Sequence, residues 1–301
     1  MKQFLFLLSV IGLTLAVAFF DKKAPIPVGI ELHTNPNEIR ALEPALNDSL
    51  DRVLAFYAQK HQLTFNGPQH IIFSQDTTFI GEKYYALSRP HVSRKNANYF
   101  ARNNCNADQT ISGVITLKVM VLCISPVDTI TPAWIYQNTA EIDATLAHEI
   151  MHSIQNKLTA ETAGGIKGNR PAGPIWMAEG TANYMARDFQ GAMVQKRMEF
   201  ERVFARAQGA DKSIDALQHS PPFGDFEYYG VSHLAAFLLI ERFGVPAMFQ
   251  YWENIGQGYN WNNSFSRAFL MPMSDFEQQF DTLRRDRNAA WDWMTAEKAD
   301  T

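Results

Sequence analysis

Apolar residues recur along the N-terminal part of the chain with two different periods. Between Ile39 and His61 they follow a helical spacing, which predicts a helix over 39–61. The segments 70–73 and 111–124 are instead rich in β-branched and apolar residues, which predicts strands. We expect residues 81–110 to form a loop or a hairpin between these strands, and the proline-rich stretch 24–37 to be an extended lead-in.

The pattern becomes helical after residue 125. Asn138 followed by Glu141 resembles a capping box in front of an apolar face, which predicts a helix over Thr139–Lys157. A glycine- and proline-rich segment, Thr159–Pro174, ends it. Further helices are expected over 175–189, 193–208 and 230–243, with short helices in the remainder, including 273–293. Strands in the first half and helices in the second indicate an α+β fold.

The first twenty residues differ from the rest of the chain. Lys2 precedes an uncharged run over residues 4–20, and Ala16-Val17-Ala18 is a small-residue cleavage site, so residues 1–20 are typical of a secretory signal peptide. The run is slightly short for a membrane span, and an uncleaved anchor formed by residues 4–20 is the alternative. We therefore expect a secreted or periplasmic protein, or one anchored to the membrane with its domain outside the cytoplasm. Residues 24–301 would form one domain with lobes over about 24–138 and 139–301.

Composition narrows the possible functions. The chain is 46% hydrophobic, 19% charged and has a net charge of −4, so it supports a buried core. No stretch concentrates lysine or arginine, which argues against nucleic-acid binding. In an exported chain the two cysteines, Cys105 and Cys123, predict one disulfide, with two buried free thiols as the alternative. Two cysteines are too few for a cysteine-type zinc site, so histidines and carboxylates would have to hold any metal.

The clearest chemical signal is His148-Glu149-Ile150-Met151-His152, an H-E-x-x-H motif on a predicted helix. Residues four apart lie on one helical face, so both imidazoles can reach one metal ion. Glu149 then lies beside the ion, where it can accept a proton from a bound water molecule. The neighbouring positions are apolar, as expected of a buried helix in which paired histidines need partners. The motif therefore predicts a metal centre at His148 and His152.

A catalytic zinc site normally has three protein ligands. The position six residues after His152 is Leu158, which excludes a third histidine there, and Glu179 on the next predicted helix is the better candidate. Here the sequence Trp176-Met177-Ala178-Glu179-Gly180-Thr181-Ala182 resembles the W-x-x-E-G-x-A helix of the gluzincin zinc metallopeptidases. Over residues 148–280 the chain is most similar to the peptidase MA-like families. It departs from thermolysin-like enzymes in its longer spacing between His152 and Glu179, and the extra residues fall in the Thr159–Pro174 segment.

The resemblance implies a zincin-like fold, with a mixed sheet and helix in the N-terminal lobe, a mainly helical C-terminal lobe and the active-site helix between them. It implies one Zn²⁺ per chain held by His148, His152 and Glu179, with Glu149 as general base. The family's oxyanion donor falls on the Tyr228–His233 segment, where Tyr229 is the best match and Tyr228 and His233 are alternatives. Asn183, one turn after Glu179, could orient a ligand, whereas Asp143 should point away from the site.

These assignments predict a zinc metallopeptidase acting on a peptide or protein substrate. Two other functions remain open. One is a zinc-binding interaction module without catalysis, and the other is a zinc-dependent amidase or esterase acting on a non-peptide substrate. The sequence indicates no oligomeric state, and it predicts membrane contact only if residues 4–20 are not removed.

Overall fold

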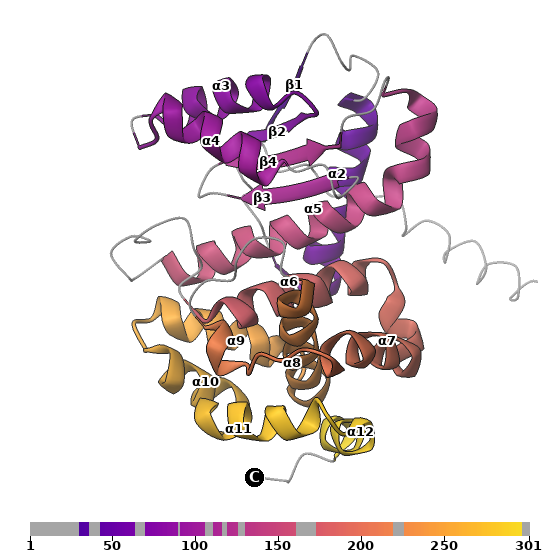
Figure 1. The fold of residues 1–301 in the computed structure, drawn as a ribbon, viewed down its shortest axis with the longest axis vertical. Helices are drawn as coiled ribbons and strands as arrows, with labels where there is room; N and C mark the ends of the chain where they lie inside the picture. Colours follow the sequence, from indigo (N-terminus) through magenta and orange to yellow (C-terminus); the bar gives the residue numbers. More distant parts are fainter. Residues whose placement is uncertain are drawn as a thin grey trace, which may run out of the picture.

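The structure, a computed structural model, combines a small sheet with a larger number of helices (Figure 1). It describes residues 30–35, 43–63, 70–89, 91–105, 111–115, 119–125, 130–160, 173–218 and 226–296. The predicted signal peptide, residues 1–20, lies outside the described residues, as does most of the glycine- and proline-rich segment.

Among the described residues, the sheet has four strands in the order β1-β2-β4-β3. The strands are β1 (Glu31–Thr34), β2 (His70–Ser74), β3 (Ile111–Ile115) and β4 (Val119–Ile124). The β1–β2 and β2–β4 pairs are parallel and the β3–β4 pair is antiparallel, so the sheet is mixed. This confirms the strands expected near 70–73 and within 111–124. β1 and β3 are the two edges of the sheet.

Each face of the sheet packs on different helices. Ile71, Phe73 and Met120 point into a core shared with α2 (Glu43–Lys60) and α5 (Pro132–Ala160). Alternate residues such as Ile72 and Val121 point to the opposite face, where α3 (Thr77–Leu87) and α4 (Arg94–Asn104) cover them. The larger core continues from α2 through α5 into the C-terminal helices.

The loop or hairpin expected over residues 81–110 is wrong, because the segment contains two helices, α3 (Thr77–Leu87) and α4 (Arg94–Asn104). Each begins at a capping side chain. Asp76 accepts hydrogen bonds from the first turn of α3, and Ser93 does the same for α4. Both helices bury only a few residues, namely Ile80, Gly81, Tyr84, Ala97 and Ala101. Because so few positions are buried, the apolar residues of this segment show no clear helical spacing in the sequence.

The long helix α5 begins earlier than the capping-box pattern predicted. The Thr131 hydroxyl accepts from the Trp134 backbone N–H at 3.1 Å, and Pro132 occupies the first helical position, where its missing N–H costs nothing. Asn138 therefore lies inside the helix, and its side-chain amide donates to the Trp134 carbonyl at 2.7 Å. The start expected at Thr139 is thus wrong by about two turns, while the expected apolar face is buried.

The C-terminal half is helical, as expected. It contains α6 (Ile175–Phe189), η1 (Ala192–Gln195), α7 (Lys196–Gln208), η2 (Asp215–Leu217), α8 (Phe226–Phe243), α9 (Val245–Gly256), α10 (Trp261–Phe269), α11 (Met273–Leu283) and α12 (Arg287–Thr295). The helical stretch expected over 273–293 is divided in two, because Asp286 caps a new helix. Figure 1 shows α5 running between the sheet with its helices and the C-terminal helices. The α+β class, the mixed sheet and the mainly helical second half are therefore confirmed.

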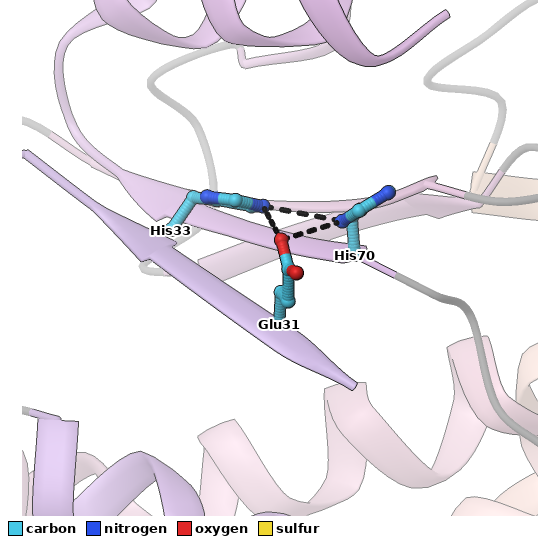
Figure 2. Close-up of side chains that lie close together, drawn as sticks. All are labelled: Glu31, His33 and His70. Atoms are coloured by element: carbon cyan, nitrogen blue, oxygen red, sulfur yellow. Dashed lines mark hydrogen bonds and ion pairs between the residues drawn. The ribbon is translucent and has the colours of Figure 1, made fainter. Parts of the chain in front are cut away.

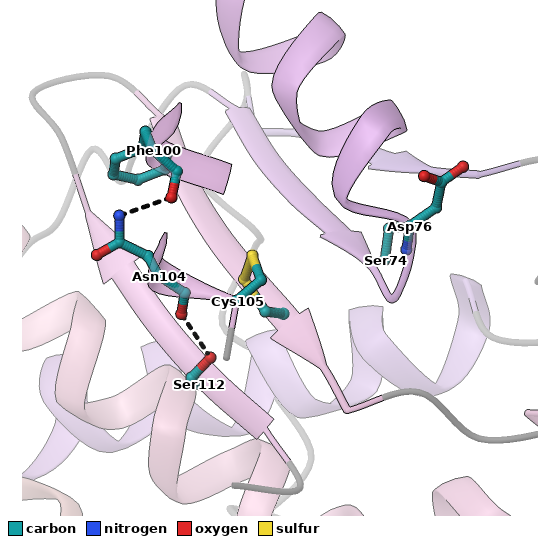
Figure 3. Close-up of a disulfide and its surroundings, with 7 residues drawn as sticks. Ser74, Asp76, Phe100, Asn104, Cys105 and Ser112 are labelled. Atoms are coloured by element: carbon teal, nitrogen blue, oxygen red, sulfur yellow. Dashed lines mark hydrogen bonds between the residues drawn. A yellow bond between two sulfur atoms is a disulfide. The ribbon is translucent and has the colours of Figure 1, made fainter. Parts of the chain in front are cut away.

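The expected disulfide is present. It joins Cys105, at the end of α4, to Cys123 in β4 (Figure 3). The Ser112 hydroxyl of β3 donates to the Asn104 carbonyl at 3.2 Å and ties the same corner to the edge strand. Since disulfides persist in oxidising environments, the bond indicates an extracytoplasmic compartment.

Within the described residues, no single helix combines the length and the apolar character that a membrane span requires. The segments Tyr228–Phe243 and Val245–Gly256 meet the criteria only as a pair, and they meet at an angle of 108°.

Candidate metal centre

The two histidines of the H-E-x-x-H motif lie on one side of α5. The opposite side of the helix is fixed in the core by Ile142, Leu146, Ile150 and Ile154. His148 and His152 consequently share the side that faces α6, and their Nε2 atoms are 3.1 Å apart. The spacing of four residues therefore produces the geometry predicted from the sequence.

Glu179 reaches the same point from α6. Its Oε2 lies 3.3 Å from His148 Nε2 and 3.5 Å from His152 Nε2. Gly180 allows α6 to approach α8 closely, since a Cβ there would lie 2.0 Å from the Ser232 carbonyl oxygen. The structure thus brings together all three predicted ligands, and their donor atoms lie within 4.8 Å of one another.

The donor set fits a zinc ion. Zinc is commonly bound by imidazole nitrogen and carboxylate oxygen, and donor atoms at the corners of a tetrahedral site with bonds of about 2.0–2.1 Å lie about 3.3 Å apart. The three distances among His148, His152 and Glu179, 3.1, 3.3 and 3.5 Å, bracket this value. Other divalent transition metals use the same ligands, so the geometry indicates a metal site without identifying the metal.

The electrostatics of the cluster favour a cation. Burial opposes a charge on His152, but the Glu179 and Glu149 carboxylates outweigh it and raise the pKa of His152 to about 9. Burial likewise opposes ionisation of Glu179, and the imidazoles of His152 and His148 nevertheless hold its pKa well below the usual value. The site therefore stabilises positive charge between two carboxylates, which is the position a divalent ion would take.

Glu149 lies beside the ligands but does not belong to their set. It is 5% exposed. Burial raises the pKa of Glu149; His148 and His152 oppose that rise, and Glu179 adds to it. Its side chain lies against Gly113 of β3, where an added Cβ would come within 2.5 Å of Glu149 Cγ. A buried carboxylate with a raised pKa, next to a metal site, is suited to accept a proton.

Gln155 is a supporting residue that the sequence reasoning did not find. Its Oε1 lies 2.9 Å from His152 Nδ1, and its Nε2 donates to the Ala178 carbonyl of α6 at 3.0 Å. With Nδ1 donating to Gln155, the Nε2 atom of His152 is free to bind a metal. Gln155 therefore orients the imidazole and joins the two ligand-bearing helices. Its position three residues after His152 was the only available signal.

Helix α2 packs against α5 and forms hydrogen bonds and an ion pair with it. The Tyr57 hydroxyl donates to the Ala147 carbonyl at 2.7 Å, directly before the motif. Arg52 forms a bidentate pair with Asp143, with N–O distances of 2.9 and 3.0 Å. Asp143 thus points away from the three ligands, as predicted. These contacts fix the position of α5 relative to α2.

The remaining candidates differ in their positions. Burial raises the pKa of Tyr229, and the charges of the Glu179 and Glu149 carboxylates raise it further. Tyr228 packs edge-on against the Tyr229 ring, with ring centroids 5.6 Å apart. Among the described residues, the Asn183 side-chain nitrogen is buried without a hydrogen-bond partner, so it does not orient His148, His152 or Glu179 through a hydrogen bond.

The structure does not bring His233 to the three ligands. Burial lowers the pKa of His233 to about 3, and the charged groups that act on it include Arg202 and Glu199 of α7, not Glu179 or Glu149. Of the three residues considered as oxyanion donors, Tyr229 therefore has the surroundings closest to the expected ones.

Residues 103–220 match the model of a family of unknown function (DUF6055). The matched region covers less than half of the chain and runs from the end of α4 past α7, so it includes His148, Glu149, His152 and Glu179. No curated protein matches the chain.

Proposed function

We propose that this chain is a zinc-dependent metallopeptidase of the gluzincin type with a zincin-like fold. The observation that carries the proposal is the convergence of His148, His152 and Glu179 from two helices with a buried carboxylate, Glu149, beside them. A site that only stored or displayed a metal would not need a buried proton acceptor at that place. This argues against a non-catalytic binding module.

The residues have separate roles in hydrolysis. When bound, a zinc ion supplies Lewis acidity toward a substrate carbonyl and promotes ionisation of a water molecule. Glu149 accepts the proton from the attacking water and later gives it to the leaving amine. Tyr229 donates a hydrogen bond to the oxygen that becomes negative in the transition state. Gln155 holds His152 in the orientation that keeps Nε2 directed at Glu179 and His148.

The disulfide supports action outside the cytoplasm. Together with the predicted signal over residues 1–20, it favours a secreted or periplasmic enzyme, and a chain anchored by residues 4–20 would work in the same compartment.

The test is zinc-dependent cleavage of a peptide library. The full chain is stripped with a chelator, divided, and assayed by mass spectrometry with and without added Zn²⁺. We expect cleavage products only after zinc is restored, because the proposed mechanism needs the ion to polarise the substrate carbonyl and to promote ionisation of water. Zinc binding without cleavage would favour an interaction module. If the protein hydrolysed small amides or esters but left the peptides uncleaved, the result would favour the non-peptide hydrolase.

Replacing Tyr229 with Phe should lower kcat about tenfold while leaving KM and zinc content nearly unchanged. A lone oxyanion donor contributes about 10²–10³-fold, and we expect less here because the metal also stabilises the negative oxygen. Steady-state kinetics on a peptide identified from the library measure the effect. Tyr228→Phe is the matched control, since that ring is next to Tyr229 in sequence and in space. A loss confined to Tyr228→Phe would reassign the donor.

A further inference from the structure

A second cluster of metal-binding side chains lies on the sheet. Glu31 and His33 of β1 and His70 of β2 point toward one another, as Figure 2 shows. His33 Nε2 lies 3.3 Å from His70 Nδ1, and Glu31 Oε2 lies 3.4 Å from His70 Nδ1 and 3.7 Å from His33 Nε2. The three donor atoms thus meet at one point.

The strand register explains this convergence. Glu31 and His33 are two residues apart, so their side chains lie on one face of β1. β1 and β2 are parallel, with Glu31 opposite His70 and His33 opposite Ile72. Ile72 packs in the cluster covered by α3 and α4, so all three side chains are on that face of the sheet. The cluster is therefore held by the backbone pairing of two strands and not by flexible loops.

The spacing matches that of the first site. The three distances at His148, His152 and Glu179 are 3.1, 3.3 and 3.5 Å, and those at the second cluster are 3.3, 3.4 and 3.7 Å. Both sets lie close to the separation of about 3.3 Å between donors in tetrahedral zinc. Two imidazole nitrogens and one carboxylate oxygen form each set.

The surroundings also suit an ion. The two imidazoles are largely covered, with side-chain exposures of 15% for His33 and 22% for His70. The Glu31 side chain is 67% exposed, so water can reach the cluster from the side of this carboxylate. Water can therefore complete the coordination of an ion that three protein ligands hold.

We propose that Glu31, His33 and His70 form a second site for a divalent transition-metal ion, of which zinc is the best fit. This site is independent of the first one, because β1 is the edge of the sheet opposite to β3, against which α5 packs. The ion would link the short strand β1 to β2 through side chains, in addition to the backbone pairing of the two strands. Its role is to stabilise this edge, and it takes no part in hydrolysis.

The test counts zinc ions per chain. Full-length protein without a polyhistidine tag is stripped with a chelator, dialysed against Zn²⁺ and analysed by mass spectrometry of the metal. We expect two zinc ions per wild-type chain, one in His148→Ala/His152→Ala, one in His33→Gln/His70→Gln and none in the fourfold variant. Zinc should raise Tm in His148→Ala/His152→Ala, because a ligand that binds only the folded state stabilises it. The fourfold variant should show no such rise.

His91→Gln is the matched control, since His91 is an exposed histidine outside both clusters and should not change the count. His33→Gln/His70→Gln should also hydrolyse peptides at the wild-type rate, which separates this proposal from the proposed function. One zinc per wild-type chain, lost with His148 and His152, would overturn the second site. So would a second ion that remains when His33 and His70 are replaced. A chain that binds two ions but cleaves no peptide would keep the second site and refute the peptidase.

Discussion

Glu149→Gln should leave zinc binding intact and lower kcat/KM for peptide hydrolysis by about 10²–10⁴-fold, the range that general acid–base catalysis contributes. Glutamine has nearly the same shape as glutamate, so it can occupy the buried position against β3. Its amide cannot accept a proton from water. Zinc content is measured by mass spectrometry of the metal, and cleavage is measured on a peptide identified from the library.

The matched control is Glu141→Gln, which removes a carboxylate from the same helix two turns away and should keep full activity. Circular dichroism and Tm would show that both variants fold. If Glu149→Gln cleaved peptides as fast as the wild type, the carboxylate would not be the general base. If the variant instead lost its zinc, Glu149 would have to be counted among the ligands.

The candidate metal site at His148, His152 and Glu179 was largely predictable from the sequence, for a specific physical reason. His148, Glu149 and His152 are within one turn of a helix, so their relative positions follow from helical geometry alone. Glu179 is far away in the chain and was identified only through its motif, W-x-x-E-G-x-A. The structure adds a packing reason for one residue of that motif, since Gly180 permits the close contact with α8.

The second cluster could not be read from the sequence in the same way. Glu31 and His33 are two residues apart on β1 and therefore share one face of the strand. His70 joins them only because β1 pairs with β2 in one particular register. A shift of one residue would turn the two β1 side chains to the other face of the sheet. Pairing between distant strands is not encoded in any local pattern, and β1 itself lies in a stretch that was expected only to be extended.

Errors in the expected fold also had physical causes. α4 is mostly polar and buries little more than Ala97 and Ala101, so hydrophobic periodicity could not reveal it. Asn138 imitated a cap, but its side chain bonds within the helix. Local polar patterns are ambiguous in this way, because the same side chain can cap a helix or bond to its interior.

Gly113→Ala should lower kcat/KM about 10²-fold without loss of zinc, because the general base would be displaced while the ligands stay in place. A Cβ at this position would lie 2.5 Å from Glu149 Cγ and 2.7 Å from its Oε1, so the carboxylate has to move. The backbone has little freedom to yield instead. Ser112, next to Gly113, is tied to α4 near the disulfide, and Tyr57 fixes α5 at Ala147. We expect a loss of about 1–3 kcal/mol in the free energy of unfolding from the crowding.

Gly113→Ala tests the position of the Glu149 carboxylate, whereas Glu149→Gln tests its ability to accept a proton. Gly209→Ala is the matched control, because in the described part of the chain no atom beyond the glycine's own neighbours lies within 4 Å of a Cβ added there. It should keep both activity and zinc. Full activity in Gly113→Ala would mean that the Glu149 carboxylate can work from a second position, and catalysis would then not depend on the contact between α5 and β3. A loss of activity with unchanged zinc content and KM would establish that the absence of a side chain at Gly113 allows the Glu149 carboxylate to take its catalytic position.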